Sequence, residues 1–295
     1  MQRTFIKQVL FTLTVAFGLQ NSAFATWSIV AVDRSTGRVV IASATCVNGD
    51  DDFLKGVQAV VVPGKAIAAC QSAAGNQDIV FRELQKGTAP RDIIELIARE
   101  DPAFQSRQYG IVDLQGRSAG HSGLTNGFVT QDIQGRVPGT EIFYSIQGNI
   151  LRSGKVIPNA VQAFVGNNGA ITDRAMAAME AASESGGDSR CVCPDPADSK
   201  AAPIPCDAKT AHVAYILMAE SNDTVGAGPS DGKYKMYITV SQPDGSGELQ
   251  ALSPTSSNLN THGPNQIKAG ENLNPVKTLR MRYDIWRKAQ PATFK

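Results

Sequence analysis

Short apolar runs rich in β-branched residues alternate with turn residues along the first half of the chain. The runs at 27–32 and 38–45 flank a polar stretch that ends in Gly37, so they predict a β-hairpin. Two more runs, at 59–62 and 66–71, are separated by a Pro-Gly turn and predict two further strands. The remaining strands are predicted at 108–113, 117–121, 142–151, 211–220 and 234–241.

Helical spacing of apolar residues occurs in separate blocks between these strands. Residues 76–86 carry apolar side chains on one helical face and stop at Gly87, and Pro90 can open a second helix directly afterwards. Ala-rich or amphipathic segments predict the other helices, at 158–164, 171–185 and 276–288. Because helices and antiparallel strands come in separate runs, the pattern predicts an α+β layered domain rather than a doubly wound α/β sheet.

Two long stretches lack apolar periodicity and interrupt this pattern. The first, 191–206, holds three cysteines and four prolines, and we interpret it as a cysteine-bearing insertion in a domain that spans 26–241. The second, 241–274, is rich in Gly, Ser, Asn and Pro and precedes the helix at 276–288. We therefore expect residues 242–295 to form a polar loop and a short C-terminal helix packed on the same domain.

The first 25 residues follow the order of a cleaved export signal. Arg3 and Lys7 precede an apolar run at 9–19, and the small-x-small sequence "AFA" ends at residue 25. The apolar run is shorter than the roughly 20 residues that a spanning helix needs, and no later segment reaches that length without charges. We expect an exported protein, periplasmic or secreted, with no membrane span after signal cleavage.

The charge balance of the mature chain argues against two classes of partner. Removal of residues 1–25 leaves 270 residues, of which 26 are basic and 27 acidic, and only 6% of the whole chain is aromatic. A net charge near zero gives no electrostatic attraction to nucleic acid or to an anionic membrane surface. Neither is predicted as a partner.

The five cysteines all follow the signal and enter a compartment where disulfides persist. Cys46 and Cys70 end two strands that we expect to be neighbours in one sheet, which predicts a Cys46–Cys70 disulfide. Within the insertion, Cys206 is predicted to pair with Cys193 or Cys191, which leaves one free thiol. The alternative is a zinc site made from these three sulfurs, but export favours oxidation and the insertion has no histidine to act as fourth ligand. No metal is predicted.

Thr26 would become the first residue of the mature chain, directly before the strand at 27–32. A threonine hydroxyl is a weak nucleophile until a base takes its proton, and an N-terminal threonine carries that base in its own α-amine. With a reference pKa of roughly 7.7–8.0, about a tenth of such amines are unprotonated at neutral pH. Because no spacer precedes the strand, the terminus would be held in the sheet. Thr26 is therefore the candidate nucleophile, and the alternative is a small residue that simply follows the cleavage site.

Several motifs give the chain a resemblance to a known family. The segments "TWSIVAVDRSTGRVVIASA", "QYGIVDLQGRSAGHSG", "SIQGNIL" and "ESGGD" occur in the order and approximate spacing of the bacterial family called domain of unknown function 1028, with a weaker echo in "NPVKTLRMRY". The match runs from Thr26 to about Ser241. The family resembles the N-terminal-nucleophile (Ntn) hydrolases, and this resemblance implies a four-layer αββα sandwich of antiparallel sheets and hydrolysis of an amide bond.

The resemblance also implies an oxyanion hole near the nucleophile, built from backbone N–H groups and polar side chains of neighbouring strands. Asn149 ends a predicted strand beside a glycine and can donate two hydrogens. Ser43 lies late in the strand that pairs with the first one, and Gln71 ends the next strand, so both can line the same sheet end. Asp33 suits an Asx turn in the hairpin. His121 suits a polar strand end, because an N-terminal nucleophile needs no histidine base.

Two functions follow from these observations. The first is an exported hydrolase of amide, including peptide-like, bonds that uses Thr26 and needs no cofactor. The second is a non-catalytic envelope protein that uses the same fold to bind or interact, for example with cell-wall peptides, because the chain has Ala44 where most family members carry lysine. A Ser–His–Asp triad is disfavoured because no Gly-x-Ser-x-Gly elbow is present. The substrate is left open between a small molecule and a peptide-like amide, and so is an oligomeric state.

Overall fold

Two antiparallel sheets form the centre of the protein. The computed structural model of the chain describes residues 26–47, 52–72, 76–191, 209–241 and 265–294. The six-stranded sheet has the order β10-β9-β2-β1-β8-β7, with β10 Met236–Ser241, β9 Val213–Ala219, β2 Arg38–Thr45, β1 Thr26–Asp33, β8 Ile142–Asn149 and β7 Gln131–Arg136. The four-stranded sheet has the order β3-β4-β5-β6, with β3 Ala59–Val62, β4 Ala66–Gln71, β5 Gln108–Asp113 and β6 Ser118–Ser122. The chain is therefore a mixed α+β protein, as predicted.

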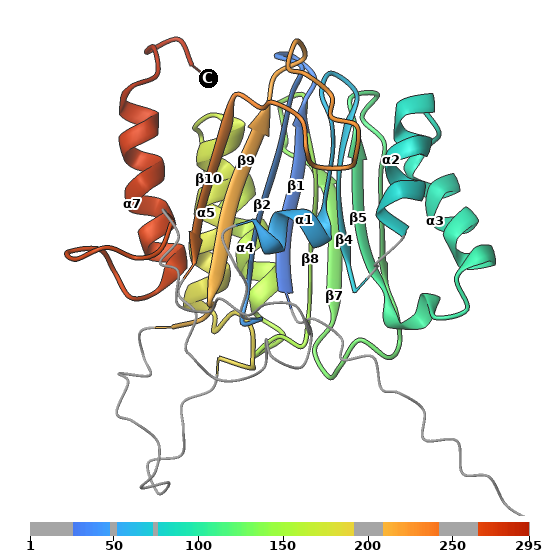
Figure 1. Ribbon diagram of the computed structural model, residues 1–295, viewed down its shortest axis with the longest axis horizontal. Helices are drawn as coiled ribbons and strands as arrows, with labels where there is room; N and C mark the ends of the chain where they lie inside the picture. Colours follow the sequence, from blue (N-terminus) through green and yellow to red (C-terminus); the bar gives the residue numbers. More distant parts are fainter. Residues whose placement is uncertain (1–25, 48–51, 73–75, 192–208, 242–264, 295) are drawn as a thin grey trace, which may run out of the picture.

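Helices cover the outer faces of both sheets (Figure 1). Helices α2 (Asn76–Lys86) and α3 (Pro90–Glu100) pack on the four-stranded sheet. Helices α4 (Val156–Gly166), α5 (Ile171–Glu184) and α7 (Pro275–Lys288) pack on the six-stranded sheet. A short helix, α1 (Phe53–Gln58), leads into β3, and a 3₁₀ turn at Phe104–Ser106 precedes β5. In the described part of the chain no helix has the length and apolar character that crossing a membrane requires.

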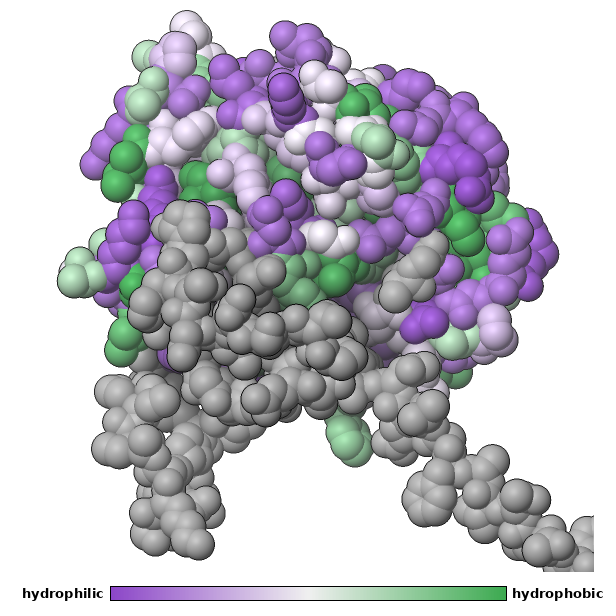
Figure 2. Space-filling view, in the orientation of Figure 1, coloured by the Kyte–Doolittle hydropathy of each residue, from purple (hydrophilic) through white to green (hydrophobic). Residues whose placement is uncertain are grey.

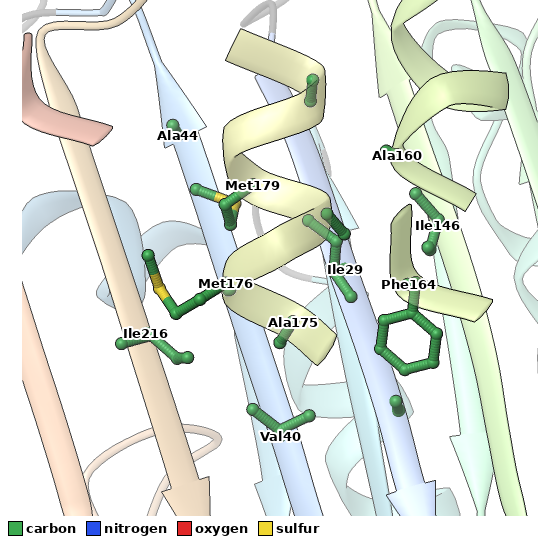
Figure 3. Close-up of a cluster of buried hydrophobic side chains, with 14 of the residues drawn as sticks. Ile29, Val40, Ala44, Ile146, Ala160, Phe164, Ala175, Met176, Met179 and Ile216 are labelled. Carbon is green, nitrogen blue, oxygen red and sulfur yellow. The ribbon is translucent and has the colours of Figure 1, made fainter. Parts of the chain in front are cut away.

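Strand alternation divides the buried side chains of β1 between two cores. Trp27, Ile29 and Ala31 point toward the helices, whereas Val30 and Val32 point toward the other sheet. On the helical side, Met176 and Met179 of α5 lie over Ile29, Val40 and Ile216 of the sheet (Figure 3). A third cluster fills the space between the four-stranded sheet and α2 and α3. The surface seen in Figure 2 is mostly hydrophilic, with hydrophobic residues scattered among polar ones.

Among the described residues the predicted strands and helices are confirmed, and the structure adds one strand and one α-helix to them. Strand β7 has the sequence "QDIQGR" and forms one edge of the six-stranded sheet, so its mostly half-exposed residues show little of the apolar pattern of an inner strand. Helix α1 spans only six residues, between the predicted strands at 38–45 and 59–62. Both elements are short or polar, and periodicity detects such segments poorly.

The predicted Cys46–Cys70 disulfide is wrong, because Cys46 is bonded to Cys191 and Cys70 is a buried free thiol. β2 and β4 belong to different sheets, and Cys70 points away from β2 into the core beneath α2 and α3. The Cys46–Cys191 bond also rules out a Cys191–Cys206 pair. The other predicted pair, Cys193–Cys206, lies outside the described residues, as do the interior of the insertion and most of the late polar loop.

Candidate functional site

The space between the two sheets is apolar at one end and polar at the other. Aliphatic side chains such as Val30, Val32 and Ile67 fill the first end. Toward the start of β1, the lower end of that strand in Figure 1, the positions of the same strands carry polar residues instead. They are Thr26, Ser28, Ser43, Thr45, Gln71, Gln108, Ser145, Gln147 and Asn149, and all are buried. A buried polar layer of this kind requires hydrogen-bond partners throughout, and so it fixes its own geometry.

Thr26 begins a strand that has a neighbour on each side. It lies opposite Thr45 of β2 and Asn149 of β8, and the residue is only 3% exposed. The Thr26 Oγ1 hydroxyl donates to Thr45 Oγ1 at 3.3 Å. Pairing on both edges and burial hold this residue in place, whereas most chain ends fray.

Four amide and hydroxyl side chains connect the sheets beside Thr26. Gln71 Nε2 donates to Ser28 Oγ at 2.8 Å, and Gln147 Nε2 donates to the same oxygen at 2.6 Å. Asn149 Nδ2 donates to Gln71 Oε1 at 3.0 Å, while the buried Asn149 Oδ1 has no partner. The network therefore links β4 to β1 and β8 across the space between the sheets, and it leaves one unsatisfied amide oxygen next to Thr26.

Directly after β4 and directly after β8, one residue has a left-handed backbone conformation. Ser72, directly after Gln71, has φ 54°, and Ile150, directly after Asn149, has φ 49°. In the described part of the chain these are the only residues other than glycine with positive φ. Such conformations cost of order 1–3 kcal/mol each and persist where the surrounding structure imposes them, often at functional sites. Both fall next to a residue of the polar network.

A glycine turn brings a charged pair to the other side of Thr45. Gly187, with φ +53°, has no room for a side chain because a Cβ would lie 2.8 Å from the Trp27 ring. The chain then places Asp188 so that its Oδ2 accepts the Cys46 backbone N–H at 2.7 Å. Arg190 Nη2 donates to Asp188 Oδ2 at 2.8 Å and to Thr45 Oγ1 at 3.3 Å. The Cys46–Cys191 disulfide joins the two segments at this point.

The sequence matches one known protein family. The family of unknown function DUF1028 matches residues 26–203, which is more than half of the chain. The chain belongs to DUF1028. A crystal structure of the DUF1028 protein SPO2555 from Silicibacter pomeroyi shares the fold, with a TM-score of 0.58 and 18% sequence identity over 92% of this chain and 91% of that one. No curated protein matches the chain.

In this DUF1028 chain three of the four predicted site residues come together. Thr26 and Asn149 are directly opposed, and Asn149 bonds to Gln71. Ser43 lies two residue pairs further along, opposite Ser28, and its hydroxyl donates to the Trp27 carbonyl oxygen at 2.7 Å. The Ser43 hydroxyl therefore bonds to the backbone of the first strand.

Two other residues lie away from the candidate site. Asp33 Oδ1 accepts the Ser35 backbone N–H at 2.9 Å, which is the predicted Asx turn, at the far end of β1. His121 pairs with Tyr109, whose side chain belongs to the core beneath α2 and α3, and its ring stacks on Phe104 with a centroid distance of 3.7 Å. Burial lowers the pKa of His121. Neither residue contacts the polar layer beside Thr26.

Sequence reasoning missed Thr45, Gln147, Asp188 and Arg190. Thr45 has a recognisable signal, because continuing the pairing of the first hairpin from its turn places residue 45 opposite residue 26. Asp188 belongs to the "GGD" motif but contacts Cys46, more than 140 residues away. No local sequence pattern predicts a contact between residues so far apart.

Proposed function

We propose that this protein is an exported hydrolase of amide bonds whose nucleophile is Thr26, made N-terminal by removal of residues 1–25. The proposal includes the four-layer αββα architecture of the Ntn hydrolases. Three observations support this architecture. Two sheets face each other and carry helices on their outer surfaces, the buried side chains form three separate cores, and Thr26 is the first residue of β1.

The observation that carries the proposal is the position of Thr26 at the polar end of the space between the sheets. Its hydroxyl faces buried polar groups, and Asn149 lies directly opposite. An N-terminal nucleophile requires an exact and rigid terminus, because small errors in placement cost much of the rate. A central strand beginning at Thr26 provides that rigidity.

The chemistry uses the α-amine that cleavage would release. The neutral amine takes the Thr26 hydroxyl proton while Oγ1 forms a bond to the acyl carbon, and the carbonyl electron pair moves onto oxygen. Collapse of this intermediate breaks the carbon–nitrogen bond, and the ammonium returns its proton to the leaving amine. Water then attacks the ester with the amine again as base, which regenerates Thr26 and releases the acid.

Asn149 is the proposed oxyanion donor. One hydrogen of Asn149 Nδ2 is engaged by Gln71 Oε1, which fixes the orientation of the amide and leaves the second hydrogen for substrate. Gln71 is itself held by Ser28, so it acts as a positioning residue. One donor of this kind is worth about 10²–10³ in rate.

Two measurements test the proposal. Intact mass and N-terminal sequencing of protein recovered from the producing cell should show a chain that begins at Thr26. A β-lactone probe should then acylate Thr26, and an amide-hydrolase screen should identify turnover. Thr26→Ala should abolish both reactions and Thr26→Ser should retain part of them, whereas Thr36→Ala, at the opposite end of the hairpin, should not change them. A different N-terminus, or a fully active Thr26→Ala variant, refutes the mechanism.

A further inference from the structure

A cavity of about 460 Å³ lies at the end of β1 that is remote from Thr26. Its lining comes from Asp33, the last residue of β1, from the connection between β7 and β8, and from the start of α5. At about 3.3 Å per residue, the length of β1 separates Asp33 from Thr26 by roughly 20 Å. The cavity is therefore distinct from the polar layer beside Thr26, and its volume is within the range of about 300–1,000 Å³ that small-molecule sites occupy.

A buried guanidinium in this lining has one free edge. Arg174 is only 5% exposed, and its Nη1 donates to the carbonyl oxygens of Phe164 and Val165 at 3.0 and 3.1 Å. Its Nε is buried without a partner, and no group in the described part of the chain accepts from its Nη2. Nε and Nη2 together form the edge on which a guanidinium holds a carboxylate with two parallel hydrogen bonds. The bonds from Nη1 fix the orientation of that edge.

The start of helix α5 lies beside Arg174 in the lining. Gly169, Ala170 and Ile171 line the cavity where this 14-residue helix begins. The first N–H groups of a helix have no partner within the helix, and the helix start carries about half a positive charge, so anions bind there. Asp173 takes the Ala170 N–H at 2.9 Å, and Arg287 in turn pairs with the Asp173 carboxylate. The negative charge nearest the helix start is thus compensated from the side of α7.

The acidic side chains of the lining determine which charge a ligand can carry. Glu141 accepts hydrogen bonds from both Arg34 and Arg136, which compensate it. Asp33 accepts hydroxyl and backbone hydrogens from its own turn and forms no ion pair among the described residues. Burial lowers the pKa of Arg174, and the nearby charge of Asp33 partly offsets this. One uncompensated carboxylate therefore remains near the free guanidinium edge, and it would repel the second charge of a dianion.

We propose that this cavity is a second binding site, separate from Thr26, for a small organic monocarboxylate. The carboxylate of the ligand meets the Nε and Nη2 edge of Arg174 and the start of α5. The buried Nε then gains the partner that a buried donor requires. The remainder of the ligand lies between Asp33 and the connection between β7 and β8.

The experiment titrates acetate into the ¹⁵N-labelled protein at pH 7 and constant ionic strength. The Nε–Hε signal of Arg174 and the backbone signals of residues 169–171 should shift together, with half-saturation at roughly millimolar concentration for a ligand of four heavy atoms. Acetamide, which has the same shape without the charge, should leave them in place. Inorganic phosphate, largely a dianion at this pH, should bind more weakly than acetate. The Nε–Hε signal of Arg287, which Asp173 already holds at 3.2 Å, serves as internal control and should not move.

Two variants test the roles of the charged residues in opposite directions. Arg174→Lys keeps a positive charge but lacks the two-donor edge, so it should weaken acetate binding at least ten-fold, as read from the signals of residues 169–171. Asp33→Asn keeps an oxygen for its turn and removes the repelling charge, so it should strengthen acetate binding about three- to ten-fold. A gain in affinity cannot arise from partial unfolding. Asp113→Asn is the matched control, because Asp113 closes the β5–β6 turn in the same way, accepting the Gln115 N–H at 3.0 Å, and lies outside this cavity.

The outcomes decide the inference without reference to Thr26. Saturable shifts at Arg174 and residues 169–171, weakened in Arg174→Lys and strengthened in Asp33→Asn, support it. Non-saturating shifts spread over many surface arginines, an equal response to acetamide, or unchanged half-saturation in both variants overturns it. Phosphate that binds more tightly than acetate overturns the assignment to a monocarboxylate.

Discussion

Gly110 on β5 permits Gln147 to cross the space between the sheets, and Gly110→Ala tests this. A Cβ at residue 110 would lie 2.0 Å from Gln147 Oε1 and 2.6 Å from its Nε2, far inside van der Waals contact. Both residues are in a fully buried region, and Gln147 cannot rotate away without losing its bonds to Ser28 and Ser145. The added methyl group must therefore displace a side chain of the polar network.

The magnitude follows from the contacts that are lost. Two buried hydrogen bonds, Gln147 to Ser28 and Ser145 to Gln147, contribute about 1 kcal/mol each, so about 2 kcal/mol disappears with them. Forcing an extra methyl group into a packed interior adds about 1–3 kcal/mol. We expect Gly110→Ala to lower the free energy of unfolding by about 3–5 kcal/mol, or roughly 6–20 °C in melting temperature at about 2–4 °C per kcal/mol.

Urea unfolding followed by tryptophan fluorescence measures this loss, with Gly56→Ala as the matched control. Gly56 lies in helix α1 with nothing within 4 Å of its added Cβ, so the same change there should stabilise by about 0.5–1 kcal/mol. In a Gln147→Ala background, Gly110→Ala should cost less than about 1 kcal/mol, because the obstacle is gone. Equal effects at residues 56 and 110, or a full cost in the Gln147→Ala background, would refute the reasoning.

Three further outcomes are expected. Removing the Cys46–Cys191 bond, which closes a loop of 145 residues, should lower the free energy of unfolding by about 5 kcal/mol in the chain-entropy estimate, measured with Cys46→Ser/Cys191→Ser in urea. Burial raises the pKa of Cys70, so at pH 8 iodoacetamide should modify it only after unfolding, and rapid native modification would contradict its burial. Hydrogen bonds from Arg282 lower the pKa of Glu271, so this pair stabilises the fold above about pH 4.3 and loses that contribution as pH falls through the lower native value. Glu271→Gln should then cost about 2 kcal/mol at pH 7 and almost nothing near pH 2, and a pH-independent difference would exclude this pairing.

Most of the fold could be predicted from the sequence, because its elements are bounded by local chemistry. Gly37 and the polar turn before it mark the first hairpin, and Gly87 followed by Pro90 separates α2 from α3. The pairing of strands into two sheets was not predictable in the same way. The Cys46–Cys70 prediction failed at this step, since it treated β4 as a neighbour of β2 in one sheet.

The same distinction between local and long-range information applies to the residues of the candidate site. Thr26 and Asn149 could be found because each occupies a recognisable strand end in a motif. Asp188 and Arg190 reach the site only because the Gly186-Gly187 turn carries the chain past Trp27. A contact of that kind depends on how α5 packs on β1 and β2, and this packing is a property of the assembled layers rather than of any local segment.

The alternation of β1 between two different interiors has an evolutionary consequence. Odd-numbered residues of β1 are surrounded by the helical core and even-numbered residues by the space between the sheets, while β2 and β8 flank the strand on both edges. A single-residue insertion or deletion within β1 would exchange these surroundings, so that Trp27 would enter the polar layer and Thr26 the helical core. Length variation among descendants of this chain should therefore avoid this strand and accumulate in the connections between elements.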